Sequence, residues 1–393
     1  MCISCKTNSM INYVKIIVTL LFVAFASLCY ISCSQSVFNA LGDYKREVVR
    51  LKPDADNEGL RQNQYTVDSV CELSLPSGME LHEATKIVVK NGRIYVMDSE
   101  FDKTIYVFDT SGKFLFRAGE RGRAKNEYID GPADFFVDDH CCLHVFDGNA
   151  YKIIIFNDSG KVDKVVDVAY LHPEDFGMLS NKEYMFDFNI NKNESNSVLV
   201  KCDKYNNVER ELLQREDVYT YVASQQTFYA NGDRLSHIPL LSDSVLVFKG
   251  DSLEKVVKFD FNGRFIMDEE PTLVVGKHTP KEIGAYKGVR GLDYYQETEN
   301  LVLLRYTYQS VCTYWLYNKK SKKSITSTAL IDGFSGLYNF FVNENQIISL
   351  VFDAGEPFSK EMYDYGYNRV PEQLQRIYDG KTKLPAVIFF SVK

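Results

Sequence analysis

The sequence predicts an all-β protein, a six-bladed β-propeller built from four-stranded antiparallel blades. Short runs rich in β-branched and aromatic residues are separated by Asp, Ser and Gly at turn positions, a pattern typical of consecutive antiparallel strands. In addition, residues 108–113 align with residues 156–161, an offset of 48 residues (156 minus 108). A repeat of this length is the size of one four-stranded blade. Counting similar groups of strands along the chain gives six blades.

The composition suits one repeat domain and limits the partners. The chain has 393 residues, of which 45% are hydrophobic, and blades that pack on their neighbours can use the whole length in a single domain. The formal net charge is -8, which argues against nucleic acid and anionic membrane surfaces as partners. The 26 Tyr and 26 Phe suit strands that pack between blades. We expect a monomer that binds no nucleic acid.

The N-terminus is predicted to be a signal peptide over residues 1–32. Lys15 precedes an uncharged run, residues 16–32, which is slightly short for a membrane span and ends in small residues. These features favour an export signal over a structural helix. Both Met1 and Met10 are candidates for the true start.

Cys33 is the predicted lipidation site. Ile31 and Ser32 precede it as in a bacterial lipobox, where the cysteine is acylated and becomes the new N-terminus. A plain cleaved signal and a retained membrane anchor are the alternatives. The polar and charged residues 33–63 are predicted to form a lipid-anchored tether.

Residues 64–393 are predicted to form the propeller. Imperfect alternation over residues 65–75 indicates a half-buried strand. We assign this strand to the final blade, because closure by a strand from the other terminus removes an exposed sheet edge. The six blades are expected at residues 84–119, 132–168, 184–213, 227–261, 291–329, and 337–351 with 386–390.

Two segments are longer than a minimal blade requires. Residues 265–290 form a long link between blades four and five, and residues 353–379 interrupt blade six. A helix is expected over residues 371–378, because Pro371 suits a helix start and Gly380 follows its end. Such insertions are either functional caps or rims, or loops without a role.

The cysteines that follow Cys33 give neither a zinc site nor a disulfide framework. They are odd in number and none has CxxC spacing, and two adjacent cysteines on a strand point to opposite faces. We expect free thiols. The residues are Cys71, Cys141, Cys142, Cys202 and Cys312.

The second blade resembles an NHL-type repeat. The matching positions are Asp147, Gly148, Asn149, Lys152, Ile153, Phe156 and Gly160. The preceding link resembles the segment that joins NHL blades, through Gly119, Gly122, Glu127, Tyr128, Pro132, Phe135, Val137 and Asp138. Together with the lipobox, these features resemble the six-bladed β-propeller lipoproteins of gut Bacteroidetes. The resemblance implies a cell-envelope protein, and residues 34–37 lack the acidic cluster of surface-exported members, which favours a periplasm-facing outer-membrane location.

Two groups of residues are candidates for ligand binding. Asp98 and Asp147 end corresponding strands, so both could face one rim of the central channel, although an Asp that caps a turn is the other interpretation. The charged link between blades one and two could contact an anionic sugar or a peptide, or could be a solvated linker. Its candidate residues are Arg121, Arg123, Glu127 and Tyr128.

The enzymatic alternative is a calcium-dependent hydrolase or lactonase of the six-bladed class. Such an enzyme needs a few acidic and amide side chains around one metal ion near the channel. The candidates are Glu83, Asp98, Asp147, Asn149 and Asp293. No Gly-x-Ser-x-Gly elbow or P-loop occurs in the sequence.

The sequence therefore leaves two hypotheses for the function, from different classes. The first is a non-catalytic binding or scaffold propeller of the cell envelope, with a glycan, peptide or protein partner and no cofactor. The second is the metal-dependent hydrolase, for which calcium would be the cofactor. Three or more carboxylate or amide side chains converging at one channel mouth would favour the enzyme, whereas an aromatic, uncharged or heterogeneous rim would favour binding.

Overall fold

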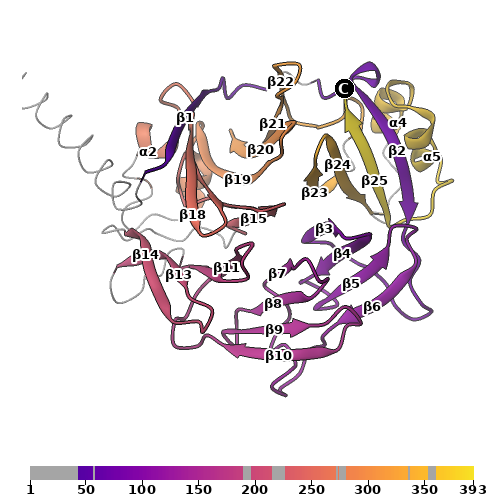
Figure 1. The fold of residues 1–393 in the computed structure, drawn as a ribbon. Coiled ribbons are helices and arrows are strands. Elements are labelled where there is room, and N and C mark those ends of the chain that lie inside the picture. The colour runs from indigo at the N-terminus through magenta and orange to yellow at the C-terminus, as the bar shows by residue number, and fades with distance from the viewer. Residues whose placement is uncertain are drawn as a thin grey trace, which may run out of the picture.

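The chain folds into a ring of six antiparallel sheets around a central axis (Figure 1). The structure is a computed structural model and describes residues 43–55, 58–188, 196–214, 226–270, 273, 280–334, 337–352 and 360–393. In each sheet consecutive strands run outward from the axis, and in two sheets an N-terminal strand is added at the outer edge. The predicted six-bladed, four-stranded propeller is confirmed.

Blades I to III follow one another along the chain without interruption of the strand order. Blade I contains β3 (Lys86–Lys90), β4 (Arg93–Asp98), β5 (Thr104–Asp109) and β6 (Phe114–Ala118). Blade II contains β7 (Asp134–Val137), β8 (Leu143–Asp147), β9 (Lys152–Phe156) and β10 (Val162–Asp167). Blade III contains β11 (Asp175–Met178), β12 (Tyr184–Asp187), β13 (Ser197–Cys202) and β14 (Val208–Gln214).

Blades IV and VI each include a strand from the N-terminal part of the chain, whereas blade V does not. Blade IV contains β15 (Phe228–Asn231), β16 (Arg234–His237), β17 (Ser244–Lys249), β18 (Ser252–Asp260) and, outermost, β1 (Lys45–Arg50). Blade V contains β19 (Val289–Glu297), β20 (Leu301–Tyr308), β21 (Val311–Asn318) and β22 (Lys323–Ser327). Blade VI contains β23 (Tyr338–Asn343), β24 (Gln346–Val351), β25 (Ala386–Val392) and, outermost, β2 (Tyr65–Glu72).

The ring is closed by pairing the two ends of the described chain. Strand β2 runs antiparallel to β25, with Tyr65 opposite Val392 and Glu72 opposite Ala386. This confirms the prediction that an N-terminal strand completes the final blade. Closure of this kind leaves β25 with a partner on both sides.

Part of the predicted tether belongs to the propeller. Strand β1 pairs in parallel with β18, from Lys45 opposite Lys255 to Arg50 opposite Asp260. The chain then passes around blade V to reach blade VI: the hydroxyl of Tyr306 donates to the carbonyl of Pro53 at 3.1 Å, and the amide of Leu60 donates to the carbonyl of Leu330 at 2.8 Å. A short 3-10 helix, η1 (Gln62–Gln64), leads into β2. We call residues 45–64 the strap.

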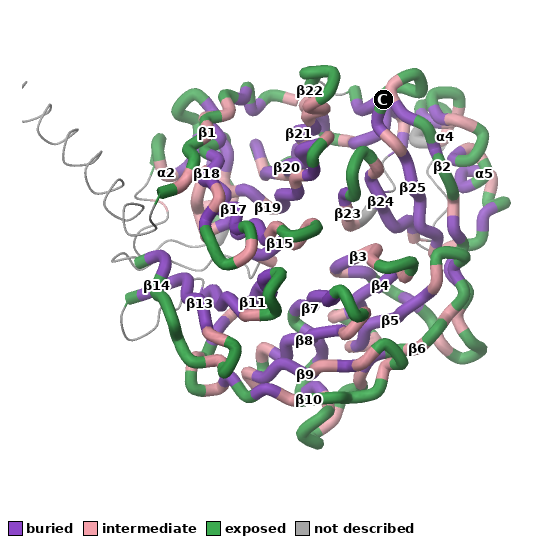
Figure 2. Tube along the Cα trace, in the orientation of Figure 1, coloured by how far each residue is buried: buried purple, intermediate pink, exposed green. Residues whose placement is uncertain are grey.

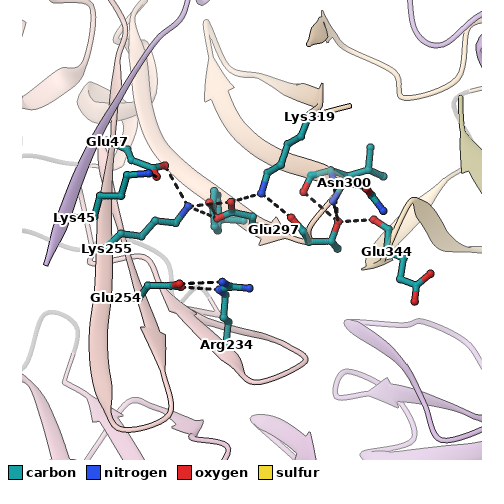
Figure 3. A network of polar contacts seen from close by, with 12 residues as sticks. Lys45, Glu47, Arg234, Glu254, Lys255, Glu297, Asn300, Lys319 and Glu344 are labelled. Atoms are coloured by element: carbon teal, nitrogen blue, oxygen red, sulfur yellow. Dashed lines mark hydrogen bonds and ion pairs between the residues drawn. The ribbon is translucent and has the colours of Figure 1, made fainter. Parts of the chain in front are cut away.

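Charged side chains join the strap to blades IV and V (Figure 3). The Lys255 ammonium lies 3.2 Å from Glu47 Oε2 and 2.8 Å from Glu297 Oε2, and the hydroxyl of Tyr295 donates to Glu297 Oε2 at 2.6 Å. Burial by itself raises the pKa of Glu297, but hydrogen bonds from Lys255, Lys319 and Tyr295 outweigh it and lower the pKa to about 2. The Lys255 ammonium of blade IV therefore connects β1, through Glu47, with blade V, through Glu297.

Aromatic side chains fill the space between neighbouring blades, as the composition suggested. The rings of Phe136 and Phe176, from blades II and III, meet edge to face at 5.1 Å, and Phe259 meets Trp315 between blades IV and V at 6.0 Å. The inner and middle strands are buried, while the turns are exposed (Figure 2). In the described part of the chain all five cysteines that follow Cys33 are free, as expected.

The two long insertions carry short helices. The link between blades IV and V holds α2 (Ile266–Glu269) and α3 (Pro280–Ala285). The interruption of blade VI holds α4 (Lys360–Gly366), the 3-10 helix η3 (Tyr367–Arg369) and α5 (Glu372–Tyr378). The predicted helix at residues 371–378 is confirmed, with Pro371 as its N-cap and Gly380 at a φ of +65° after its end. Helices α4 and α5 lie at the outer side of blade VI, away from the axis (Figure 1). Within the residues described, no helix is both long and apolar enough to cross a membrane.

Candidate functional site: the central cavity

A cavity of about 900 Å³ occupies the centre of the ring. Every blade contributes to its wall through the first, innermost strand or the turn that follows it. One wall residue from each blade, in order, is Lys86, Phe135, Met178, Tyr229, Tyr294 and Phe340. Because the turns after the six inner strands meet at one end of the ring, residues such as Asn91, Ser180 and Asn343 surround the mouth of the cavity.

The wall mixes aromatic rings, amides and charges of both signs. The aromatic residues are Phe135, Phe136, Tyr229, Tyr294, Phe340 and Phe341. The amides are Asn91, Gln226, Asn231, Gln296, Asn339 and Asn343. The cations are Lys86, Lys90, Lys182, Arg234 and Arg305, and the carboxylates are Asp138, Asp139, Asp233 and Asp293.

Lys86 connects blades I and II at the base of the cavity. Its ammonium donates to Asp134 Oδ1 at 2.7 Å and to the Phe135 carbonyl at 2.9 Å, and it lies 4.2 Å from the centroid of the Phe136 ring. The second carboxylate oxygen of Asp134 is buried without a hydrogen-bond partner. Burial raises the pKa of Asp134, and the neighbouring Lys86 opposes this shift.

Asp175 occupies the same position in blade III and faces blade IV. Its Oδ2 accepts hydrogen bonds from the amide of Thr227 at 2.7 Å and from the Thr227 hydroxyl at 2.9 Å. Burial raises its pKa well above the usual value, and the nearby charge of Asp134 adds to the shift. The first residues of β3, β7 and β11 thus join blade I to blade II and blade III to blade IV with buried polar contacts.

Blade V supplies most of the polar groups on the opposite wall. The hydroxyl of Tyr229 lies 2.8 Å from the main-chain carbonyl of Asp293, and the hydroxyl of Thr307 donates to Asp293 Oδ2 at 2.7 Å. Arg305 stands beside them and is half-buried. Thr307 and Arg305 come from the second strand, β20, and not from the innermost one.

Asp98 and Asp147 do not line this cavity. Both are fully buried where their strands end. Asp98 Oδ1 accepts a hydrogen bond from the amide of Phe101 at 2.9 Å, and Asp147 accepts from the amides of Asn149 at 3.1 Å and Ile129 at 2.9 Å. The structure therefore places both residues as turn caps.

The link between blades I and II is held by its own contacts and also lies off the cavity. Tyr128 is buried, and its hydroxyl donates to the carbonyl of Ala118 at 3.0 Å. Glu127 Oε2 accepts from the amide of Ala124 at 2.8 Å. Arg121 and Arg123 are exposed, with Arg121 3.5 Å from Asp130. Of the candidates from the sequence, Asp293 alone lines the cavity.

The described residues bring together one group that could hold a metal ion: His82, Asp98 and Asp102, whose ligand atoms lie within 4.8 Å of one another. His82 Nδ1 is 3.3 Å from Asp102 Oδ2, which also accepts from the hydroxyl of Tyr106 at 3.0 Å. Calcium takes six to eight oxygen ligands, and the oxygens of Asp98 already accept backbone amides. The group therefore does not match a calcium site, and it lies outside the cavity.

The residues that the sequence did not single out are Lys86, Asp134, Asp175 and Arg305. Lys86 and Asp134 are separated by 48 residues (134 minus 86), the same offset as the repeat of blades I and II, so they hold equivalent positions. This periodicity was a usable signal for the first two. Arg305 had none, because it lies within an ordinary strand pattern.

The fold and the cavity define a six-bladed β-propeller with a central space of ligand size. Residues 81–366 match the family described as a domain of unknown function, DUF4934, and the chain belongs to this family. No curated protein matches the sequence.

Solved structures share this fold. A predicted exported protein from Bacteroides fragilis has a TM-score of 0.71 at 15% identity, covering 88% of this chain and 99% of that chain. A member of the DUF4221 family from Bacteroides vulgatus has a TM-score of 0.48 at 12% identity, covering 85% and 99%. A virginiamycin B lyase from Staphylococcus aureus has a TM-score of 0.42 at 8% identity, covering 84% and 100%. At 15% identity, the likeness to the first of these structures shows the fold alone.

Proposed function

We propose that this chain is an exported, lipid-anchored cell-envelope protein whose propeller binds a small polar ligand, a glycan or a peptide, without catalysis. The observation that carries the proposal is the central cavity of about 900 Å³, to which all six blades contribute. Ligand sites in proteins are typically clefts of about 300–1,000 Å³ with apolar walls and a few placed polar groups.

The composition of the wall supports a polar ligand. Aromatic faces such as those of Tyr294 and Phe340 offer flat apolar surface, and amides such as Gln226 and Asn343 both donate and accept hydrogen bonds. Charges of both signs are present, so the rim is heterogeneous and not a cluster of acids around one point. Amides and carboxylates also surround the mouth, but Asp138 and Asp139 are paired with Lys182 and Lys90, and the metal-binding group found among the described residues includes no wall residue. The heterogeneous rim therefore favours a binding module.

The hydrolase alternative receives less support. A metal-dependent hydrolase needs its metal beside the bound substrate. His82, Asp98 and Asp102 are absent from the cavity wall. We therefore propose a binding module in preference to an enzyme.

Export and lipidation remain proposals that rest on the N-terminal sequence, and Cys33 lies outside the described residues. The fold shared with an exported Bacteroides protein supports export. Changing Cys33→Ala should move the protein from the membrane to the soluble fraction. Retention of the variant in the membrane fraction would count against lipidation.

Ligand binding is tested by calorimetry of the chain without residues 1–33, using glycans and peptides that first raise its melting temperature. Ser180 is exposed at the mouth of the cavity. We expect Ser180→Trp to abolish binding by covering the mouth and Ser180→Ala to leave it unchanged. Equal binding by both variants would place the ligand elsewhere.

A further inference from the structure

Arg305 reaches the cavity in a way that differs from most of the wall. In the other blades the wall consists mainly of inner-strand residues and the turns that follow them. In blade V, Arg305 and Thr307 of the second strand also line it. An irregularity in the inner strand explains this difference.

The inner strand β19 pairs irregularly with its neighbour β20. Its pairing with β20 shifts between Val289 and Gly291 and again between Leu292 and Tyr294. Such bulges re-aim side chains and are common beside binding sites. Gly291 pairs with Thr307, and a Cβ added to Gly291 would meet no atom within 4 Å. We call this open space beside Gly291 the window; the residue opposite Gly291, Thr307, lines the cavity together with Arg305.

Arg305 differs from the other cations of the cavity in its ion pairing. Four of the five cavity cations form ion pairs: Lys86 with Asp134 at 2.7 Å, Lys90 with Asp139 at 2.8 Å, Lys182 with Asp138 at 2.6 Å and Arg234 with Glu254 at 2.6 Å. Among the residues that the structure describes, no carboxylate lies within ion-pair distance of Arg305.

The other polar groups beside Arg305 in the described part of the chain are Tyr314 and Asp293. Asp293 is near enough to attract it, but Asp293 Oδ2 accepts the hydroxyl of Thr307. A guanidinium has five N–H donors, and the described residues offer Arg305 no carboxylate at ion-pair distance, so these donors are available to a ligand.

We propose that this window is a carboxylate subsite, in which the guanidinium of Arg305 binds a carboxylate group of the ligand. Arg pairs with carboxylate through two parallel hydrogen bonds, a geometry that Lys does not reproduce. The proposal rests on the binding function proposed above and adds the class of ligand: an acidic one, either a sugar acid or a peptide with a free C-terminus. The rings of Tyr229 and Tyr294 line the wall beside the subsite.

The test uses matched pairs of probes that differ only in charge. Calorimetry compares oligogalacturonate with the corresponding neutral galactose oligomer, and peptides ending in a carboxylate with the same peptides ending in an amide. We expect the acidic member of one pair to bind at least about tenfold more tightly, the scale of a charge-assisted hydrogen bond. The pair that shows the preference identifies the source of the carboxylate.

Substitutions test the preference for a carboxylate separately from binding in the cavity as a whole. Arg305→Gln should remove the preference for the acidic probe, Arg305→Lys should keep part of it, and Arg121→Gln, an equal loss of charge on the exposed link, should not change it. Gly291→Val should weaken binding of the acidic probe, because the valine side chain fills the window while every charge stays in place. Unchanged melting temperatures of these variants in the absence of probe confirm that they fold.

The outcomes are distinguishable. Equal binding of acidic and neutral probes, or a preference that survives Arg305→Gln, overturns the carboxylate subsite and leaves cavity binding standing. Binding that is insensitive to both Ser180→Trp and Gly291→Val overturns the cavity function itself. A preference lost in Arg305→Gln and Gly291→Val, and kept in Arg121→Gln, supports the subsite.

Discussion

At the scale of single residues, the first position of an inner strand connects one blade to the next. Lys86 and Asp134 hold equivalent positions in blades I and II, and their side chains meet at 2.7 Å with almost no exposure to solvent. A buried ion pair adds little net stability compared with an apolar pair, but breaking it leaves a buried charge. The pair therefore fixes how blades I and II meet more than it raises their stability.

Changing Lys86→Met should destabilise the protein by about 3–5 kcal/mol, because Asp134 would keep a buried carboxylate without its partner. The double change Lys86→Met with Asp134→Leu should recover most of that loss. Urea unfolding at pH 7 measures both. If the double variant is no more stable than the single one, the loss comes from packing and not from the uncompensated charge.

Two glycines with similar backbone conformations test whether the Tyr128 ring requires a residue without a side chain at position 119. Gly119 and Gly78 both have positive φ, at +78° and +84°, so alanine is strained at either position by about 1–2 kcal/mol. A Cβ at Gly119 would lie 2.3 Å from the Tyr128 ring, whereas one at Gly78 would meet nothing within 4 Å. Thermal unfolding should show a clearly larger loss for Gly119→Ala than for Gly78→Ala. Equal losses would mean that the ring moves aside without cost.

At the scale of secondary-structure elements, regular hairpins were predictable and additions to the edges were not. The strands of blades I and II lie where the sequence predicted them, because they are apolar and buried and the turns between them carry Asp and Gly. Strand β1 was not predicted from the sequence, because all its residues are exposed or half-buried and its pairing partner β18 lies about 200 positions away in sequence. Polar sequence alone does not separate such a strand from a tether.

The strap network gives a pH dependence with a definite sign. The pKa of Glu297 is about 2 in the folded protein and 4.5 ordinarily, so the folded state binds its proton less readily than the unfolded chain does. Its contribution to stability is therefore fully present above about pH 4.5 and is lost as the pH falls towards 2. Denaturant unfolding of Glu297→Gln should show a smaller loss of stability over this range than the parent. Identical pH profiles would exclude Glu297 as a source of the acid sensitivity.

At the scale of the whole molecule, the ring and its blade count followed from a repeat that is visible in two blades. The cavity site did not, because it is assembled from side chains on six blades whose relative positions no local pattern encodes. Asp98 and Asp147 were singled out by their position at strand ends, and the same position explains why they cap turns. Arg305 becomes notable only once the irregular pairing of β19 is known.

Truncation tests which N-terminal segment closes the ring. Removing residues 1–64 takes away the strap and leaves β2, so we expect a lower melting temperature and a monomer. Removing residues 1–74 also takes away β2 and exposes the edge of β25, so we expect association through that edge. Light scattering after gel filtration distinguishes the two. A monomeric product of the longer truncation with an unchanged melting temperature would show that β2 is dispensable.

The pairing of β2 with β25 also determines when the ring can close during synthesis of the chain. Tyr65 lies opposite Val392, and the amide of Lys393 donates to the carbonyl of Gln64 at 2.9 Å, so β2, which is synthesised early, pairs only once the last strand has been made. Contacts so distant in sequence form late and slowly. A chain crossing a membrane from its N-terminus would therefore hold an open ring until its final residues arrive. Export and ring closure would in that case follow one another in sequence.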